Sequence, residues 1–249
     1  MAAELRPRRV LIVGATSAIA AEVARLYAGR GASLVLTGRN PARLAAVEAD
    51  LRVRGAASVE TEVLDVLDRD RHASIVKRAF AGGLDVALVA HGDLPDQQRC
   101  QADPGEAARA LELNLVATVE LLTLLANEFE ARRSGTLAVI TSVAGDRGRQ
   151  SNYVYGAAKA GLSVFLQGLR QRVHAAGVSV VTLKPGFVDT PMTAHLPRNP
   201  LASSPRRAAG AIHRAIESRR EVAYIPWFWR PVMALIRALP ESLFKRLQL

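Results

Sequence analysis

Cysteine is almost absent from this sequence, with Cys100 as the only one among 249 residues. A lone cysteine excludes an intramolecular disulfide, and with it the disulfide framework of a small secreted domain. Long apolar runs are missing as well, because the basic N-terminal residues lead into an apolar run of only four residues, VLIV at 10–13. A membrane span needs about 20 apolar residues. The sequence therefore predicts neither a signal peptide nor a span, and it indicates a protein of the reducing cytoplasm.

Acidic residues are outnumbered, with 23 Asp and Glu against 33 Lys and Arg, so the formal net charge is +10. Such a balance can attract nucleic acid, anionic lipid or an anionic cofactor. The basic residues are spread along the chain, however, and pairs such as Arg132-Arg133 and Arg206-Arg207 come with neither an RNP-like aromatic pattern nor a metal finger. We expect no nucleic-acid partner and no metal site.

Seven short β-branched runs alternate with longer helical segments along the chain. Several of the runs are apolar throughout, as parallel strands buried on both faces are. This order predicts an α/β fold, a single doubly wound Rossmann domain in which a parallel seven-stranded sheet carries helices on both faces. The predicted strands are 10–13, 33–37, 59–64, 85–90, 136–142, 178–184 and 221–225, and predicted helices include 17–30, 41–53, 104–131 and 154–175.

The stretch VGATSAIA, residues 13–20, joins the first predicted strand to the first helix. Such a junction places backbone N–H groups and a helix N-terminus where a pyrophosphate can lie. Gly14 allows the tight turn, whereas Ala18 and Ala20 put a methyl group where glycine would allow the closest approach. Taken alone, the stretch fits a phosphate turn and a purely structural turn about equally.

The second predicted strand ends in LTGRN, which contains Arg39 and no acidic residue. An acid at this point binds the ribose 2′-hydroxyl of NAD, whereas an arginine accommodates the 2′-phosphate of NADP. The sequence predicts a preference for NADP(H), with NAD(H) as the alternative. A solvated arginine with no ligand is the other interpretation.

Tyr155 and Lys159 form a YxxxK pair, four residues apart and therefore one turn apart on the same helix face. A phenol with a pKa near 10 is a poor acid–base group at neutral pH until a nearby cation favours its anion, and Lys159 is placed to do so. Ser142 ends a buried strand, where sheet enzymes bind their ligands. By itself the pair is also typical of ordinary helix packing.

These residues together resemble the short-chain dehydrogenase/reductase family. The resemblance includes the turn at Gly14, Asp65 after the third strand, Asn114 in a long helix, the serine and YxxxK residues, and PGFVDT at 185–190. It extends over residues 10–190, with the motifs in the family's order. It implies an NAD(P)-dependent oxidoreductase that acts on CH–OH groups.

The resemblance also implies a role for each catalytic residue. Tyr155 would protonate the substrate carbonyl oxygen during reduction, and Ser142 would polarise that carbonyl. Lys159 would lower the tyrosine pKa and hold the nicotinamide ribose. Asn114 would anchor a water that connects Lys159 to solvent. Proton donation beside an oriented carbonyl is the chemistry that hydride delivery requires.

For the cofactor, the family assigns Asp65 to the adenine ring and Val188 with Thr190 to the carboxamide. The family's NNAG after the fourth strand is VAHG here, which places His91 near the cofactor, either as a hydrogen-bonding group or as a packed loop histidine. The predicted cofactor residues are Gly14, Thr16, Ser17, Ala18, Ile19, Arg39, Asp65, Val66, Ala90, His91, Gly92, Tyr155, Lys159, Pro185, Gly186, Val188 and Thr190.

Within the family, the chain is similar to the ketoreductase subgroup that epimerises decaprenylphosphoryl-ribose together with a flavin oxidase during cell-wall biosynthesis. The stretches that carry this likeness are GATSAI, VALVAHG, NYVYGAAKAGL, PMTAHL (191–196) and RPVMALIRALPESLFKRL (230–247). The subgroup implies a polyprenylphosphoryl keto-sugar as substrate. Arg39 departs from its pattern, so the cofactor preference is not taken from the subgroup.

Residues 226–249 differ in composition from the predicted domain, 1–225. They mix Trp227, Phe228 and Trp229 with aliphatic and basic residues, which suits a segment that lies in a lipid interface. The equal alternative is a helix and loop docked on the protein or on a second subunit. The basic net charge favours an anionic surface, and so peripheral contact with the inner face of the membrane.

The first hypothesis is an NADPH-dependent ketoreductase acting on a lipid-linked or other amphiphilic carbonyl substrate. A soluble 3-oxoacyl or small-ketone reductase is the alternative within the enzyme class, and a non-catalytic nucleotide-binding partner is the alternative outside it. Family members often pair through helices equivalent to 104–131 and 154–175, which implies a homodimer or homotetramer.

Overall fold

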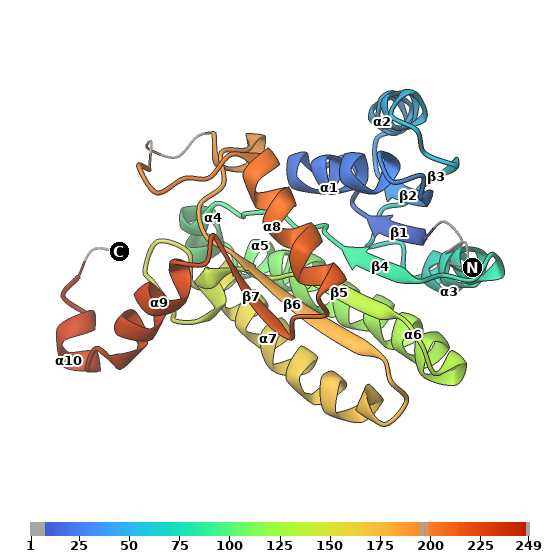
Figure 1. Cartoon of the computed structure of the whole chain (residues 1–249). Helices are drawn as coiled ribbons and strands as arrows, with labels where there is room; N and C mark the ends of the chain where they lie inside the picture. The colour runs from blue at the N-terminus through green and yellow to red at the C-terminus, as the bar shows by residue number, and fades with distance from the viewer. Residues whose placement is uncertain (1–7, 195–196, 198, 248–249) are drawn as a thin grey trace.

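The computed structural model describes residues 8–194, 197 and 199–247, and its centre is a sheet of seven parallel strands (Figure 1). The strands lie in the order β3-β2-β1-β4-β5-β6-β7, so the chain reverses its winding direction between β1 and β4. The predicted doubly wound Rossmann sheet is confirmed. Its strands are β1 (Arg9–Val13), β2 (Ser33–Gly38), β3 (Ser58–Val63), β4 (Val86–Val89), β5 (Thr136–Ile140), β6 (Ser179–Pro185) and β7 (Val222–Ile225).

Helices cover both faces of the sheet, as predicted (Figure 1). The predicted helix 104–131 is present but contains a π-helical turn, Glu112–Val116. Its two α-helical parts are α5 and α6. The helices are α1 (Ala18–Ala28), α2 (Pro41–Val53), α3 (His72–Ala81), α4 (Gln97–Ala102), α5 (Pro104–Leu111), α6 (Ala117–Arg132), α7 (Tyr153–His174), α8 (Pro205–Glu217), α9 (Trp229–Ala238) and α10 (Glu241–Phe244).

The side chains of β1 explain why a central strand is apolar throughout. Val10 and Ile12 pack in the cluster that contains α1 and α8, whereas Leu11 and Val13 pack in the cluster that contains α3, α6 and α7. Successive side chains of a strand point to opposite faces, so each face of the sheet needs its own apolar set. Full burial of one such side chain contributes roughly 1.5–3 kcal/mol, and these two cores fix the strand ends that carry the site.

The helix formed by α5, the π-helical turn and α6 is long and apolar enough to cross a membrane by length and composition alone. In the fold, Leu121, Leu125 and Phe129 of this helix are fully buried against the sheet. Packing in the core thus accounts for these three apolar residues.

The C-terminal segment packs on the body of the protein through α9 and α10 (Figure 1). Trp229 is 5% exposed and Met233 is fully buried beside Val143. The guanidinium of Arg147 donates to three carbonyls, those of Ile236 (2.9 Å), Arg237 (3.1 Å) and Leu239 (2.6 Å). It also pairs with Glu241 at 2.7 Å and lies 3.9 Å from the centre of the Phe244 ring.

Arg147 therefore caps the C-terminus of α9, because it binds carbonyls that have no partner within the helix. Through these contacts α9 and α10 pack on the protein from Trp229 to Phe244. His195 and Leu196, which belong to the PMTAHL likeness, and residues 248–249 lie outside the described residues.

Candidate active site

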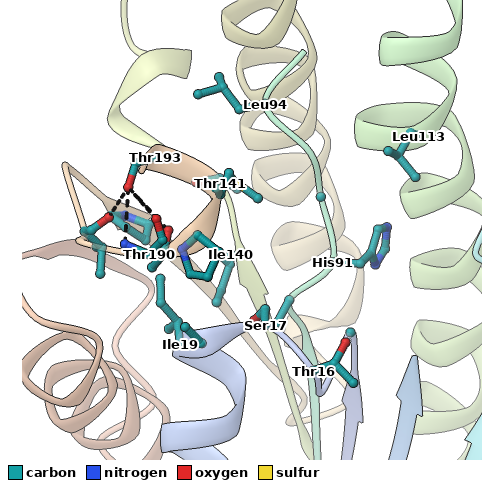
Figure 2. Close-up of a pocket in the computed structure, with 18 of the residues that line it drawn as sticks. Thr16, Ser17, Ile19, His91, Leu94, Leu113, Ile140, Thr141, Thr190 and Thr193 are labelled. Atoms are coloured by element: carbon teal, nitrogen blue, oxygen red, sulfur yellow. Dashed lines mark hydrogen bonds between the residues drawn. The ribbon is translucent and has the colours of Figure 1, made fainter. Parts of the chain in front are cut away.

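A cleft of about 360 Å³ opens at the carboxyl ends of the strands, where the strand order reverses (Figure 2). Ligands of doubly wound sheets bind at this point. Sixteen of the seventeen predicted cofactor residues line the cleft, and Asp65 is the exception. Figure 2 shows that the lining comes from distant parts of the chain, with Thr16 and Ser17, His91 and Leu94, Ile140 and Thr141, and Thr190 and Thr193 around one space.

Gly14 is required at the turn between β1 and α1 for two reasons. Its φ is +82°, which disfavours any residue with a Cβ, and a Cβ there would lie 2.8 Å from the backbone of His91. The N–H groups of Gly14 and Ala15 both donate to the carbonyl of Thr37, at 3.0 and 2.8 Å. The turn is therefore held between the ends of β2 and β4.

The two alanines of the turn differ in what they face. Ala18 lines the cleft, whereas Ala20 is fully buried in the core and does not line it. Ser17 caps α1, because its hydroxyl accepts from the N–H of Ala20 at 3.2 Å. Of the two alanines, only Ala18 places its methyl at the cleft, so the missing glycines restrict the turn less than the sequence suggested.

Two guanidiniums, those of Arg39 and Arg43, line the far end of the cleft. Within the described residues, neither has a carboxylate partner. Arg39 follows β2 as predicted, and Arg43 was not predicted. The sequence carried a signal for it, because Asn40 and Pro41 begin α2 and so place Arg43 in the first turn beside Arg39.

Asp65 is exposed and does not line the cleft, although its neighbours Leu64 and Val66 do. Its carboxylate accepts from the N–H of Leu67 at 3.0 Å. The adenine contact predicted for Asp65 stays a prediction.

The imidazole of His91 packs against α6 rather than pointing to the phosphate turn. Its Nε2 lies 2.9 Å from the hydroxyl of Thr118 on α6, and Figure 2 shows the ring directed away from Ser17. Burial, and then the charge of Lys159, lower the pKa of His91 to about 3, so the ring is neutral. The His91 backbone, rather than its ring, supports the turn at Gly14.

Two of the predicted catalytic residues, Tyr155 and Lys159, line the near end of the cleft, whereas Ser142 and Asn114 are not among its lining residues. Tyr155 and Lys159 lie one turn apart on α7, with Lys159 Nζ 5.6 Å from the centre of the Tyr155 ring. Lys159 Nζ also donates to the carbonyl of Ile140 at 3.4 Å. Ser142, just after β5, accepts from the N–H of Ala144 at 3.1 Å and is close enough to the Tyr155 phenol to lower its pKa.

The protonation states of this group follow from burial. Desolvation raises the pKa of Tyr155 to about 12, the hydrogen bond from Ser142 opposes the rise, and the charge of Asp93 adds to it. Burial lowers the pKa of Lys159 to about 8. At neutral pH the phenol is therefore protonated and the ammonium is mostly charged. The expected lowering of the tyrosine pKa by Lys159 is not found in the free protein.

Asn114 lies in the π-helical turn and is 1% exposed. Its Oδ1 accepts from the N–H of Asp93 at 3.1 Å, and its Nδ2 donates to the carbonyl of Ala110 at 3.0 Å. A Cβ at Gly92 would lie 3.0 Å from Asn114 Oδ1 and 3.3 Å from Lys159 Nζ. Asn114 thus holds the loop after β4 against the ammonium, while the water assigned to it stays a prediction.

The side of the cleft around Gly186 and Phe187 holds lining residues that the motifs did not single out. Trp229 backs this side, since a Cβ on Gly186 would lie only 2.0 Å from Trp229 Nε1 and the rings of Phe187 and Trp229 are 5.9 Å apart. No local sequence pattern predicts that Trp229 packs behind this side of the cleft. The added lining residues here are Leu94, Leu113, Asn152, Phe187, Met192 and Thr193.

The described cleft fits a nicotinamide dinucleotide. It has a turn that only glycine can make at residue 14, two unpaired guanidiniums at one end and a phenol beside an ammonium at the other. Arg39 and Arg43 would hold a ribose phosphate, the residues 16–19 the pyrophosphate, and Lys159 the second ribose. Such a group, when bound, supplies a hydride.

Comparisons with known proteins agree with this geometry. A family model described as short chain dehydrogenase matches residues 8–200. An uncharacterized oxidoreductase of Mycobacterium tuberculosis is 40% identical over 240 residues, which cover 96% of this chain and 96% of the relative. One of Streptomyces coelicolor is 36% identical over 245 residues, which cover 97% and 96%.

Among solved structures, a short-chain dehydrogenase from Sphingobium yanoikuyae in complex with NADPH has a TM-score of 0.82 at 24% identity, over 94% of this chain and 97% of that chain. At this identity the likeness concerns the fold.

Proposed function

The chain belongs to the short-chain dehydrogenase/reductase family and is an NAD(P)-dependent oxidoreductase, and we propose that it uses NADPH to reduce the ketone of an amphiphilic, lipid-linked substrate. A polyprenylphosphoryl keto-sugar is the substrate we infer, with a secondary alcohol as product. The observation that carries the proposal is the pairing of a protonated phenol, Tyr155, with Ser142 and the charged Lys159 at the cleft.

The chain's own residues account for the proton side of the reaction. The Ser142 hydroxyl and the Tyr155 phenol donate to the carbonyl oxygen, which orients the ketone and polarises it. Tyr155 then gives its proton to that oxygen as negative charge develops there. The hydrogen bond from Ser142 favours the resulting phenolate, because it lowers the Tyr155 pKa that burial raises.

Two features of the cleft support a substrate that is part sugar and part lipid. Asn152 lines the cleft three residues before Tyr155. A polar amide in the cleft wall suits a substrate hydroxyl. Leu94, Phe187 and Met192 make the same side apolar, which suits a hydrocarbon chain.

Arg39 and Arg43 support the preference for NADPH over NADH. Paired guanidiniums recognise a phosphate through charge-assisted hydrogen bonds, and the described lining residues at this end of the cleft include no acid. The fold is one that holds NADPH in the Sphingobium yanoikuyae structure.

We place the enzyme in the cytoplasm at the inner face of the membrane, as a homodimer or homotetramer. The docked C-terminal segment leaves Trp227 74% and Leu235 68% exposed, close to basic residues such as Arg230. Exposed aromatic and aliphatic side chains mixed with arginine suit peripheral contact with anionic lipid. Co-sedimentation with liposomes tests this placement: the Trp227→Ala, Leu235→Ala double variant is expected to bind less, and equal binding would contradict it.

The function is tested by NADPH oxidation with a panel of ketones, namely a polyprenylphosphoryl keto-sugar, a 3-oxoacyl thioester and a small cyclic ketone, with and without liposomes. We expect the highest kcat/KM for the lipid-linked keto-sugar. A higher value for the 3-oxoacyl or small ketone would favour the soluble-reductase alternative. Binding of NADPH without turnover of any ketone would favour a nucleotide-binding partner.

A further inference from the structure

A second cavity, of about 590 Å³, lies outside the cleft, between α8, β7 and the segment 225–228. Three arginines line it: Arg207 and Arg214 on α8, and Arg220 just before β7. Its described lining includes no aspartate or glutamate. The cavity is therefore basic, and nothing in the reductase chemistry uses it.

The three guanidiniums have no carboxylate, carbonyl or aromatic partner among the described residues. Arg170, by comparison, donates to the carbonyl of Val180 at 3.1 Å. The acidic residue of α8, Glu217, is engaged elsewhere, by the Tyr27 phenol at 3.0 Å and by Arg8 at 3.1 Å. Like charges around one space repel each other, so an anion in the cavity is favoured.

The spacing on α8 explains the shape of the cavity. Arg207 and Arg214 are seven residues apart, which puts them on one face of the helix and about 10 Å apart along its axis. Ala211 and Ala215 lie on the same face, and their short side chains leave the hollow between the arginines.

The wall opposite α8 is aromatic. Trp227, which is 74% exposed, and Phe228 line the cavity together with Pro226. An exposed tryptophan beside basic groups suits a ligand with an apolar body and an anionic head.

We propose that this cavity binds the phosphate group of an amphiphile, with the phosphate on Arg207, Arg214 and Arg220 and the apolar part against Trp227 and Phe228. The chemistry is shared by a membrane phospholipid and by a free lipid phosphate. The site is separate from the cleft, so it stands independently of the reductase proposal.

The test is titration of the whole protein with octyl phosphate below its micelle concentration, followed by tryptophan fluorescence. Octyl glucoside has the same tail without the charge, and inorganic phosphate has the charge without the tail. We expect saturable binding of octyl phosphate and at least tenfold weaker binding of both controls. Equal binding of octyl glucoside would overturn the proposal, because the cavity would then be merely apolar.

Variants locate the site. Arg214→Gln and Arg207→Gln are each expected to weaken octyl phosphate binding about tenfold, whereas Arg206→Gln, on the same helix but outside the cavity lining, leaves it unchanged. Trp227→Phe removes the fluorescence signal, which shows that Trp229 is not the reporter. A signal that survives this change, or equal losses in all three arginine variants, would contradict the assignment.

Competition identifies the source of the phosphate. Displacement of octyl phosphate by phosphatidylglycerol vesicles, but not by phosphatidylcholine vesicles, points to a lipid headgroup. Displacement by neither points to a free lipid phosphate, and equal displacement by both overturns the role of the arginines. NADPH affinity, measured in parallel, is expected to stay constant in every arginine variant, which separates this site from the cleft.

Discussion

The ammonium of Lys159 lies 5.6 Å from the centre of the Tyr155 ring, one helical turn along α7. Both groups are perturbed by burial, in opposite senses: the pKa of Tyr155 rises to about 12 and that of Lys159 falls to about 8. The free protein thus holds a neutral proton donor beside a cation. That is the protonation state needed before a carbonyl is reduced.

Tyr155→Phe removes the proton donor and leaves the ring. We expect kcat to fall by roughly 10²–10⁴, the usual contribution of a positioned general acid, while the Kd for NADPH changes little. Stopped-flow turnover and NADPH fluorescence measure the two quantities. Turnover at the wild-type rate would mean that another group protonates the product oxygen.

The free energy of unfolding is expected to rise between pH 8 and pH 10. The folded pKa of Lys159 is about 8, against about 10.4 in an unfolded chain, so in this window the unfolded state binds more protons and stability increases with pH. The slope is at most about 1.4 kcal/mol per pH unit. Above pH 10 the raised pKa of Tyr155 acts in the opposite sense.

Urea unfolding at pH 7, 8, 9 and 10 measures this slope. Lys159→Met is expected to flatten it, whereas Lys77→Met, at an exposed position, keeps the wild-type slope. The same slope in all three proteins would show that burial of Lys159 does not control the pH dependence.

Arg39→Ala and Arg43→Ala are each expected to weaken NADPH binding by about tenfold to a hundredfold, because each removes a charge-assisted hydrogen bond worth roughly 1.5–3 kcal/mol. The affinity for NADH serves as the internal control and stays within twofold (about 0.4 kcal/mol). Isothermal titration with both cofactors gives the ratio. An unchanged ratio in Arg39→Ala would leave this arginine as a solvated residue.

Arg147→Ala is expected to loosen α9 and α10, since one guanidinium serves three carbonyls of the α9 terminus. Faster proteolysis after residue 226 and a red shift of Trp229 emission would report the loosening. Glu241→Ala is the matched control: it removes only an ion pair whose carboxylate is 78% exposed, which contributes about 1 kcal/mol or less. Equal proteolysis of the two variants would contradict the role given to Arg147.

Local patterns predicted most of the fold. The seven strands and the placement of Ser142, Tyr155 and Lys159 followed from periodicity and spacing, because parallel strands buried on both faces are apolar throughout and helix neighbours recur at fixed intervals. The position of Arg39 at the end of β2 followed in the same way.

Other features depend on contacts between residues far apart in the sequence. The core position of Ala20, the Thr118 partner of His91 and the docking of Trp229 on Gly186 are set by the assembled sheet, and no short pattern encodes them. The π-helical turn at 112–116 likewise could not be predicted from the local sequence. It places Asn114 where its Oδ1 accepts from the loop after β4.

The placement of Trp229 behind Gly186 and Phe187 separates two properties of the enzyme. The side of the cleft formed by Gly186 and Phe187 is supported by residues beyond the last strand, whereas Tyr155 and Lys159 lie on α7 and Ser142 lies just after β5. Substitutions in α9 can therefore reshape the space for the substrate without altering the sheet register or the acid–base group. Substrate range and chemical step are, in this architecture, independently variable.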